Sequence, residues 1–152
     1  MPTAITLHLD KYTSKIKLLK KENKTYVWDL VRRKYVILKP EEMVRQLVIH
    51  YLVEELKYPK TSISIERQIK RQGASKRYDL ITYNSQFSPY VLFEFKSFNV
   101  KLDDTTFIQS AIYNSQIKAE YLCITNGVMA YCCRSDHDSK SIYFCSELPT
   151  YR

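Results

Sequence analysis

One apolar stretch near the middle of the chain carries charges that a buried strand does not ordinarily tolerate. Residues 90–97 read Tyr-Val-Leu-Phe-Glu-Phe-Lys-Ser, and their apolar run predicts a short strand covered on both faces. Glu94 and Lys96 stand two positions apart, so both side chains point to the same side of a sheet. Because a buried charge needs a partner charge or a metal ion, this pair constrains both the fold and any site built on it.

Length and composition predict one globular domain that spans residues 1–152. The chain has 152 residues, of which 45% are hydrophobic and 26% charged, values that are ordinary for a domain with a real core. No apolar run approaches the roughly 20 residues of a membrane span, and no signal peptide is recognisable at the N-terminus. We therefore expect a soluble, cytoplasmic protein.

The positive charge is concentrated at the N-terminus. The net charge is +8, and residues 1–40 hold ten Lys or Arg against three Asp or Glu. Short apolar-alternating pieces here predict a small, basic, β-rich extension over residues 1–39, followed by a core over residues 40–150. A basic surface suits a polyanion such as nucleic acid, although it also suits a surface that only aids solubility. The basic residues are Lys11, Lys15, Lys17, Lys20, Lys21, Lys24, Arg32, Arg33, Lys34 and Lys39.

The core pattern predicts an α/β order of helix, three strands, helix, and two or three strands. A helix is expected to begin at Pro40, where proline is favoured, and to end before Tyr58-Pro59. A second helix is expected over residues 105–118, with Asp103 or Asp104 as its cap. The predicted strands cover residues 62–66, 77–83, 90–97, 121–125, 129–133 and 141–144, with turns at Gln72-Gly73 and Asn126-Gly127.

Four cysteines raise the question of zinc or disulfides. They are Cys123, Cys132, Cys133 and Cys145, and no Cys-x-x-Cys spacing occurs among them. Three lie in apolar, strand-like runs, where a reduced cysteine behaves as a small hydrophobe. We expect reduced, metal-free cysteines in the core.

Asp79 joins Glu94 and Lys96 as a candidate catalytic residue. Asp79 lies in the predicted strand before Glu94, and two carboxylates on adjacent strands can hold a hard cation such as Mg²⁺. Such a cation promotes hydrolysis of a phosphodiester, and Lys96 on the same face can orient water or stabilise charge on the phosphate. Taken alone, the spacing favours a structural ion pair of Lys96 with Asp79 or Glu94 over a catalytic site.

The second predicted helix presents Gln109 and Tyr113 on one face, because they are four residues apart. An amide and a phenol there can position phosphate, backbone or a metal-bound water. They can also form a partly buried polar face without any function.

Together these residues resemble the D, E-x-K and Q-x-x-x-Y pattern of PD-(D/E)XK nucleases. The order along residues 25–150 is similar to the N-terminal domain of type I restriction enzyme R subunits, in a short single-domain form. The resemblance implies a restriction-endonuclease-like fold with a central mixed sheet flanked by helices, and cleavage of double-stranded DNA with Mg²⁺ or Mn²⁺. It implies Asp79 and Glu94 as metal ligands, Lys96 as the catalytic lysine, and Gln109 and Tyr113 as the accessory motif.

One further acid is implied on the first helix, for which Glu41 is the first choice and Glu42 the second. The chain departs from a complete R subunit because no ATP-driven motor fits into it. A further expectation is a homodimer, in which two sites could cut both DNA strands, or a complex with other restriction-system subunits. The competing hypotheses are a non-catalytic DNA-binding or assembly module, and a structural domain of a defence complex.

Overall fold

A computed structural model describes residues 3–66, 68–71 and 74–152, without the side chains of residues 68–71, 74–76, 113, 115 and 116. Within this part of the chain, seven strands form a mixed sheet in the order β1-β11-β10-β9-β8-β5, with β12 also paired to β11. Neighbouring strands β9 and β10 are parallel and the other pairs are antiparallel. The strands are β1 Ile5–Thr6, β5 Ile63–Ile65, β8 Leu80–Tyr83, β9 Pro89–Phe95, β10 Tyr121–Thr125, β11 Met129–Asp136 and β12 Ser141–Phe144.

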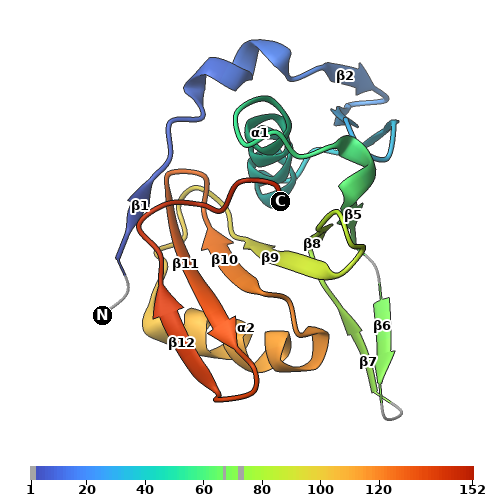
Figure 1. Cartoon of the computed structure of the whole chain (residues 1–152). Coiled ribbons are helices and arrows are strands. Elements are labelled where there is room, and N and C mark those ends of the chain that lie inside the picture. The colour runs from blue at the N-terminus through green and yellow to red at the C-terminus, as the bar shows by residue number, and fades with distance from the viewer. Residues whose placement is uncertain (1–2, 67, 72–73) are drawn as a thin grey trace.

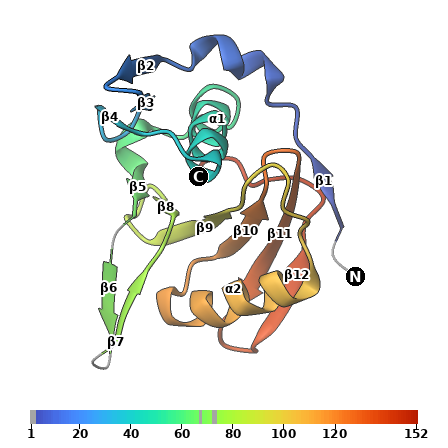
Figure 2. The same cartoon turned by 180° about the vertical axis from the view of Figure 1, so that it is seen from behind.

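Two helices cover opposite faces of this sheet (Figures 1 and 2). Helix α1 spans Pro40–Glu54 and begins at proline as expected, whereas α2 spans Asp104–Ile117. Asp103 caps α2 by accepting a hydrogen bond from the Thr106 N–H at 2.8 Å. The mixed sheet with flanking helices confirms the predicted fold class. Among the described residues, no helix combines the length and apolar character needed to cross a membrane.

The first helix ends earlier than its apolar pattern suggested. Leu56 was expected inside it, but the last helical residue is Glu54. Lys57 adopts a left-handed backbone with φ of 64°, a conformation that does not continue a right-handed helix toward Pro59. The side chain of Leu56 is nevertheless buried. The apolar spacing therefore marks a buried position that lies just after the helix instead of inside it.

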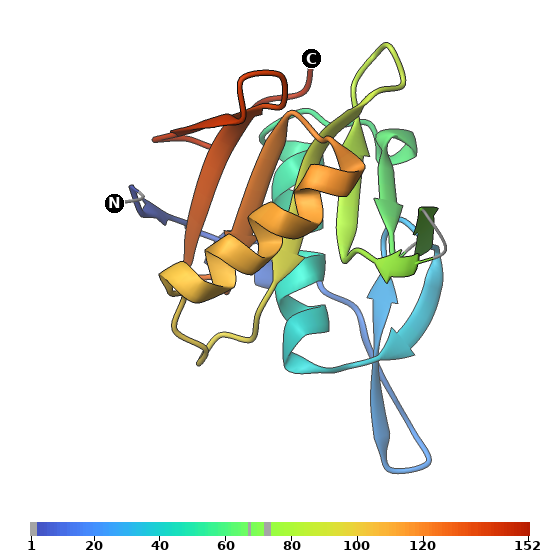
Figure 3. The same cartoon turned by 90° about the horizontal axis from the view of Figure 1, so that it is seen from below.

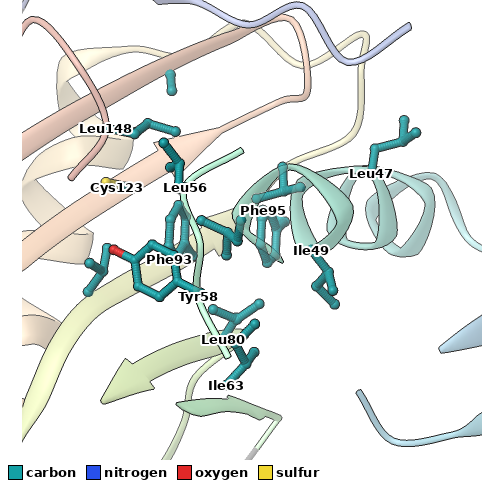
Figure 4. Close-up of a cluster of buried hydrophobic side chains, with 14 of the residues drawn as sticks. Leu47, Ile49, Leu56, Tyr58, Ile63, Leu80, Phe93, Phe95, Cys123 and Leu148 are labelled. Carbon is teal, nitrogen blue, oxygen red and sulfur yellow. The ribbon is translucent and has the colours of Figure 1, made fainter. Parts of the chain in front are cut away.

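The main sheet separates two apolar cores. On the α1 side, Val91, Phe93 and Phe95 point into the larger core, which Figure 4 shows around Tyr58, Leu80 and Phe93. On the α2 side, a smaller core contains Leu92 together with residues of β10, β11 and α2. Alternation along β9 therefore places Glu94, like Leu92, on the α2 side.

The N-terminal region is β-rich, as predicted, but it is not a separate appendage. Strand β1 pairs with β11 of the main sheet, and Leu9 and Tyr12 are buried in the larger core. A 3-10 helix at Asp10–Lys15, which the apolar alternation did not predict, connects β1 to a three-stranded antiparallel sheet. The strands of that sheet are β2 Leu18–Lys21, β3 Lys24–Asp29 and β4 Lys34–Ile37.

Two predicted strands differ from the observed ones. The strand expected over residues 77–83 is divided into β7 Ala74–Arg77 and β8 Leu80–Tyr83, with Tyr78 and Asp79 between them. Strand β7 pairs with β6 Gln68–Arg71 in a separate hairpin, whose turn at residues 72–73 lies outside the described residues. The central strand ends at Phe95, so Lys96 follows the strand instead of lying inside it.

The hairpin between β10 and β11 forms near the predicted Asn126-Gly127 turn, shifted by one residue. The Asn126 N–H bonds to the Met129 carbonyl at 3.3 Å, which leaves Gly127 and Val128 at the turn. Gly127 has a φ of 89°, a backbone conformation that favours glycine. The expected burial of the cysteines is confirmed for Cys123, Cys132 and Cys133, whereas Cys145 is half-buried.

Candidate active site

The site begins at an interruption in a long β-ribbon. Ile65 pairs with Leu80 and Gln68 pairs with Arg77 in the same register, so β5–β6 and β7–β8 form one ribbon with a break between them. At this break the Glu66 N–H bonds to the Asp79 carbonyl at 3.2 Å, while Glu66 adopts a φ of 49°. Breaks and bulges of this kind occur at the edges of sheets and change the direction in which a side chain points.

The break turns the carboxylate of Asp79 toward the end of β9. Its Oδ2 accepts a hydrogen bond from the Phe95 N–H at 2.8 Å, so a side chain takes the place of a backbone partner there. Leu80 pairs with Phe93, and this register continued by one residue places Asp79 opposite Glu94. Opposite residues on antiparallel strands lie on the same side of a sheet, so the two carboxylates come together.

Asp79 and Glu94 line one open pocket of about 320 Å³, whereas Lys96, which was expected on the same face, is not among the residues that line it. The pocket is lined by β9, by residues 77–79 at the end of β7 and the break, and by α2. Its lining residues are Arg77, Tyr78, Asp79, Leu92, Phe93, Glu94, Gln109 and Ser110. The geometry therefore unites three elements that are far apart in the sequence, although the role of the carboxylates in catalysis stays a prediction.

Burial raises the pKa of the Asp79 carboxyl above its ordinary value. The hydrogen bond from Phe95 and the charge of Arg45 act in the opposite direction, whereas the nearby Glu94 carboxylate raises the pKa further. Within the described part of the chain, no Lys or Arg side chain forms an ion pair with Asp79. Asp79 is thus a half-buried carboxylate beside a pocket, and among the described residues it forms no ion pair.

Glu94 is held by two side chains instead of the backbone. Its Oε2 accepts a hydrogen bond from the Ser110 hydroxyl on α2, and its Oε1 lies 3.0 Å from the Lys96 Nζ. The Lys96 N–H bonds to the Thr125 carbonyl at 2.9 Å, which fixes the chain just beyond β9. A purely structural role for Lys96 predicted an ion pair with either Asp79 or Glu94, and the pair with Glu94 is the one that the structure contains.

The Q-x-x-x-Y residues are only partly placed by the structure. Gln109 lies on α2, is exposed, and lines the pocket with Asp79 and Glu94. The backbone of Tyr113 is helical, but its side chain lies outside the described residues. Gln109 therefore reaches the site as predicted, while the position of the Tyr113 phenol stays a prediction.

The two candidate acids on α1 have different surroundings. Glu41 is exposed in the first turn and lines a second pocket, of about 540 Å³, that also reaches Asp79. Glu42 is buried and bonded to the side chains of Arg32, Arg45 and Gln46. Of the two, only Glu41 keeps a carboxylate free of ion pairs in the described part of the chain.

A network of alternating charges supports the backbone of Asp79 from the α1 side. Arg45 is buried and lies 2.7 Å from a Glu66 carboxylate oxygen and 3.1 Å from a Glu42 oxygen. It also lies 3.5 Å from the Asp79 carbonyl oxygen. Burial alone would raise the pKa of Glu66, but hydrogen bonding to Arg45 and the charges of Arg77 and Arg32 hold this pKa below its ordinary value.

The two carboxylates of Asp79 and Glu94 are a ligand set that fits Mg²⁺. They do not fit a cation that must take all of its ligands from the protein. Among the described residues, no group of three or more His, Cys, Asp or Glu side chains is arranged to hold a metal. Mg²⁺ is commonly bound by one or two carboxylates, with water and substrate oxygens as its other ligands. The pocket is open to solvent, so water and substrate oxygens could reach such a cation. Its two carboxylates supply the negative charge that the cation needs.

Sequence reasoning missed Ser110 and Arg45, although both carried a signal. Ser110 and Asn114 are polar positions on the apolar face of α2, and both are buried. Arg45 lies among the apolar positions of α1, where a lone guanidinium must find acceptors. Polar residues inside an apolar helical stripe are the signal that could have identified them.

Comparison with known proteins supports the fold and identifies a family. The family model of the type I restriction enzyme R protein N terminus (HSDR_N) matches residues 40–149. A solved fragment assigned to the HsdR subunit of a type I restriction enzyme from Vibrio vulnificus YJ016 has a similar fold, with a TM-score of 0.52 and 20% sequence identity. The match covers 74% of this chain but 24% of that one, so the chain spans about a quarter of the solved relative.

Among curated proteins, none matches the chain significantly. The family match nevertheless covers well over half of the sequence and includes α1, both strands of the candidate site and α2. It confirms the resemblance drawn from the motifs and indicates a restriction-enzyme context. The chain belongs to the family of type I restriction enzyme R protein N-terminal domains.

Proposed function

We propose that the protein is a metal-dependent DNA endonuclease that hydrolyses phosphodiester bonds at the pocket shared by Asp79 and Glu94. The observation that carries this proposal is the Asp79 carboxylate, which is half-buried, has a raised pKa and shares its pocket with Glu94 without an ion-pair partner in the described part of the chain. A protein gains nothing in stability from such an arrangement. A bound cation would neutralise both acids.

In this proposal Asp79 and Glu94 hold Mg²⁺ or Mn²⁺, and the cation supplies Lewis-acid activation of water and neutralises charge on the phosphate. Lys96, beside Glu94, donates to the attacking water or to a phosphate oxygen as negative charge grows there. Gln109 lies on the pocket wall and positions the substrate backbone. Glu41, on the opposite side of Asp79, is the candidate for a further acid near the cation.

The restriction-enzyme family supports double-stranded DNA as the substrate. Two cuts in a duplex need either two active sites or successive cleavage events, so a homodimer or assembly with other restriction-system subunits is part of the proposal. Because the chain spans a quarter of the solved relative, coupling to other activities of that protein is not included.

A plasmid-nicking assay with Mg²⁺ or Mn²⁺ tests the proposal. Wild-type protein should convert supercoiled plasmid to nicked or linear DNA, and EDTA should stop the reaction. Asp79→Asn preserves shape but removes the charge, so cleavage should fall by at least about 100-fold. Asp138→Asn makes the same change at an exposed turn between β11 and β12, and it should leave cleavage intact.

A non-catalytic DNA-binding module is the second candidate, because the Glu94–Lys96 ion pair also fits a structural role. Calorimetric titration of Mg²⁺ or Mn²⁺ into wild type and Asp79→Asn separates the two. The nuclease proposal expects binding heat from wild type that the variant lacks. Equal, negligible heats with and without DNA, together with no cleavage, would establish the binding module.

A further inference from the structure

The basic residues of the N-terminal region divide into two groups that the sequence does not separate. Lys11 and Lys15 form ion pairs with Glu55 and Glu54 at the end of α1, and Arg32 belongs to the network around Glu42 and Glu66. The other seven form no ion pair within the described part of the chain. They are Lys17, Lys20, Lys21, Lys24, Arg33, Lys34 and Lys39, all exposed and all on or next to the β2–β4 sheet.

The β2–β4 sheet has one packed face and one open face. Val27 and Asp29 are buried, so the face that carries them lies against the protein. The alternate positions form the open face, which we define as Leu19, Lys21, Lys24, Tyr26, Trp28, Tyr35 and Ile37. Leu19, Tyr35 and Ile37 are 40%, 41% and 49% exposed. No acidic residue occurs at these seven positions.

Two like charges on the open face oppose each other directly. Lys21 and Lys24 are partners in the β2–β3 register, and like charges at opposite positions destabilise a strand pair. Glu22 in the intervening turn forms no ion pair within the described residues. A polyanion placed across the hairpin would relieve this repulsion.

The open face continues into the candidate active site. Tyr26, Tyr35 and Ile37 line the second pocket, whose far wall includes Asp79 and Glu41. Figure 3 shows the β2–β3 hairpin projecting away from the main sheet, so the surface extends beyond this pocket. A linear polyanion on the open face would therefore lead from the hairpin to Asp79.

We propose that the open face is a docking surface for the phosphate backbone of double-stranded DNA, which it leads into the second pocket. The choice of DNA as the ligand rests on the proposed function. The choice of this surface rests on its positive charge, which complements the phosphates. Lys21 and Lys24, with Lys17 and Lys39 on the same face by the continued register, contact phosphates and release their counterions. Contacts of this kind carry affinity and position but no base specificity.

Fluorescence anisotropy with a labelled 20-base-pair duplex in EDTA tests this surface without cleavage or metal. Wild-type affinity should fall steeply between about 50 and 200 mM salt. The β2–β3 triple variant Lys17→Gln, Lys21→Gln, Lys24→Gln should lower the slope of log K against log salt by about 2 to 3, since each phosphate contact contributes about 0.9. The matched control Lys60→Gln, Lys118→Gln, Lys140→Gln changes the net charge equally on exposed positions elsewhere, and it should keep the wild-type slope.

An unchanged slope in the β2–β3 variant, or an equal loss in both triple variants, would overturn the proposal. Tighter binding of a single strand than of the duplex would overturn the assignment to double-stranded DNA. Circular dichroism melting of each variant verifies that the fold is kept, and single Lys21→Gln and Lys24→Gln variants replace the triple one if it unfolds. Because the assay contains no metal, its failure is distinguishable from failure of the nuclease proposal, which rests on nicking and Mg²⁺ binding.

Discussion

The two carboxylates of the candidate site are supported from opposite sides of the sheet by different chemistry. On the α1 side, the backbone of Asp79 is held by Arg45, which also bridges Glu42 and Glu66, while its carboxylate is bonded to the Phe95 N–H. On the α2 side, Glu94 is held by the Ser110 hydroxyl and by Lys96. One support is a dense buried network, and the other is a single hydroxyl with a partly exposed amine.

This difference indicates how the site is built. Asp79 is fixed through the backbone, so its position depends on the ribbon break and on the whole network beneath it. Glu94 is fixed through side-chain contacts, and its side chain is 32% exposed. The α1 side should therefore govern stability, whereas the α2 side should govern the geometry with which the second carboxylate meets a cation. Three variants test this division.

The largest effect is expected from Arg45→Met. Removing the buried guanidinium takes one charge partner from Glu42 and one from Glu66, which keep Arg32 and Arg77 nearby. Breaking a buried ion pair typically costs about 3–5 kcal/mol. Urea denaturation measures the change. Arg134→Met is the matched control, because Arg134 is 61% exposed and lies 3.6 Å from Glu120, and such pairs contribute about 0–1 kcal/mol. A cost below about 1 kcal/mol for Arg45→Met would show that the α1 network does not support the fold.

A smaller effect on stability is expected from Ser110→Ala, with a clear effect on the cation. The lost hydrogen bond to Glu94 should cost about 1 kcal/mol in the unfolding free energy. Loss of an orienting partner should weaken Mg²⁺ binding by about 10-fold or more, as measured by calorimetry. Ser14→Ala, at an exposed position of the 3-10 helix, serves as the control. Unchanged Mg²⁺ affinity in Ser110→Ala would mean that α2 does not position Glu94.

The smallest effect is expected from pH. Burial raises the pKa of Asp79 in the folded protein above 3.8, its ordinary value, so the folded state binds more protons than the unfolded state in the window above pH 3.8. Stability from this group therefore falls as pH rises through that window. In EDTA, Asp79→Asn should gain in melting temperature relative to wild type as pH is raised from about 4 toward neutrality.

Mg²⁺ should oppose this pH effect in wild type alone, because a ligand that binds only the folded state stabilises it. Parallel melting curves for wild type and Asp79→Asn across the whole pH range would contradict the raised pKa. Stabilisation of both proteins by Mg²⁺ to the same extent would assign the ion to another part of the molecule.

Much of the architecture followed from local patterns. The alternation and helical spacing predicted β9, β10, α1 and α2 closely, since each element buries a face that the sequence marks with apolar residues. The motif order placed Asp79, Glu94 and Gln109 on neighbouring elements, and all three line one pocket. These features depend on residues within one element or on two adjacent ones.

The unpredicted features depend on contacts between distant segments. The break at Tyr78 and Asp79 is stabilised by the Phe95 N–H and by Glu66, so nothing within residues 77–83 marks it. The support from Ser110 and Arg45 likewise depends on where α2 and α1 lie against the sheet. The pairing of Lys11 and Lys15 with α1 reduces the free basic surface in a way that charge counting does not detect.

The hydrogen bond between the Phe95 amide and the Asp79 carboxylate gives the molecule an internal spectroscopic reporter. An amide proton that points at a carboxylate senses its charge, so the Phe95 ¹H–¹⁵N resonance should shift when Asp79 is protonated and when a cation reaches it. Phe95 belongs to the strand that carries Glu94, and its side chain is buried in the larger core. A single backbone signal would therefore follow the occupancy of the site without any label on the side chains that perform the chemistry.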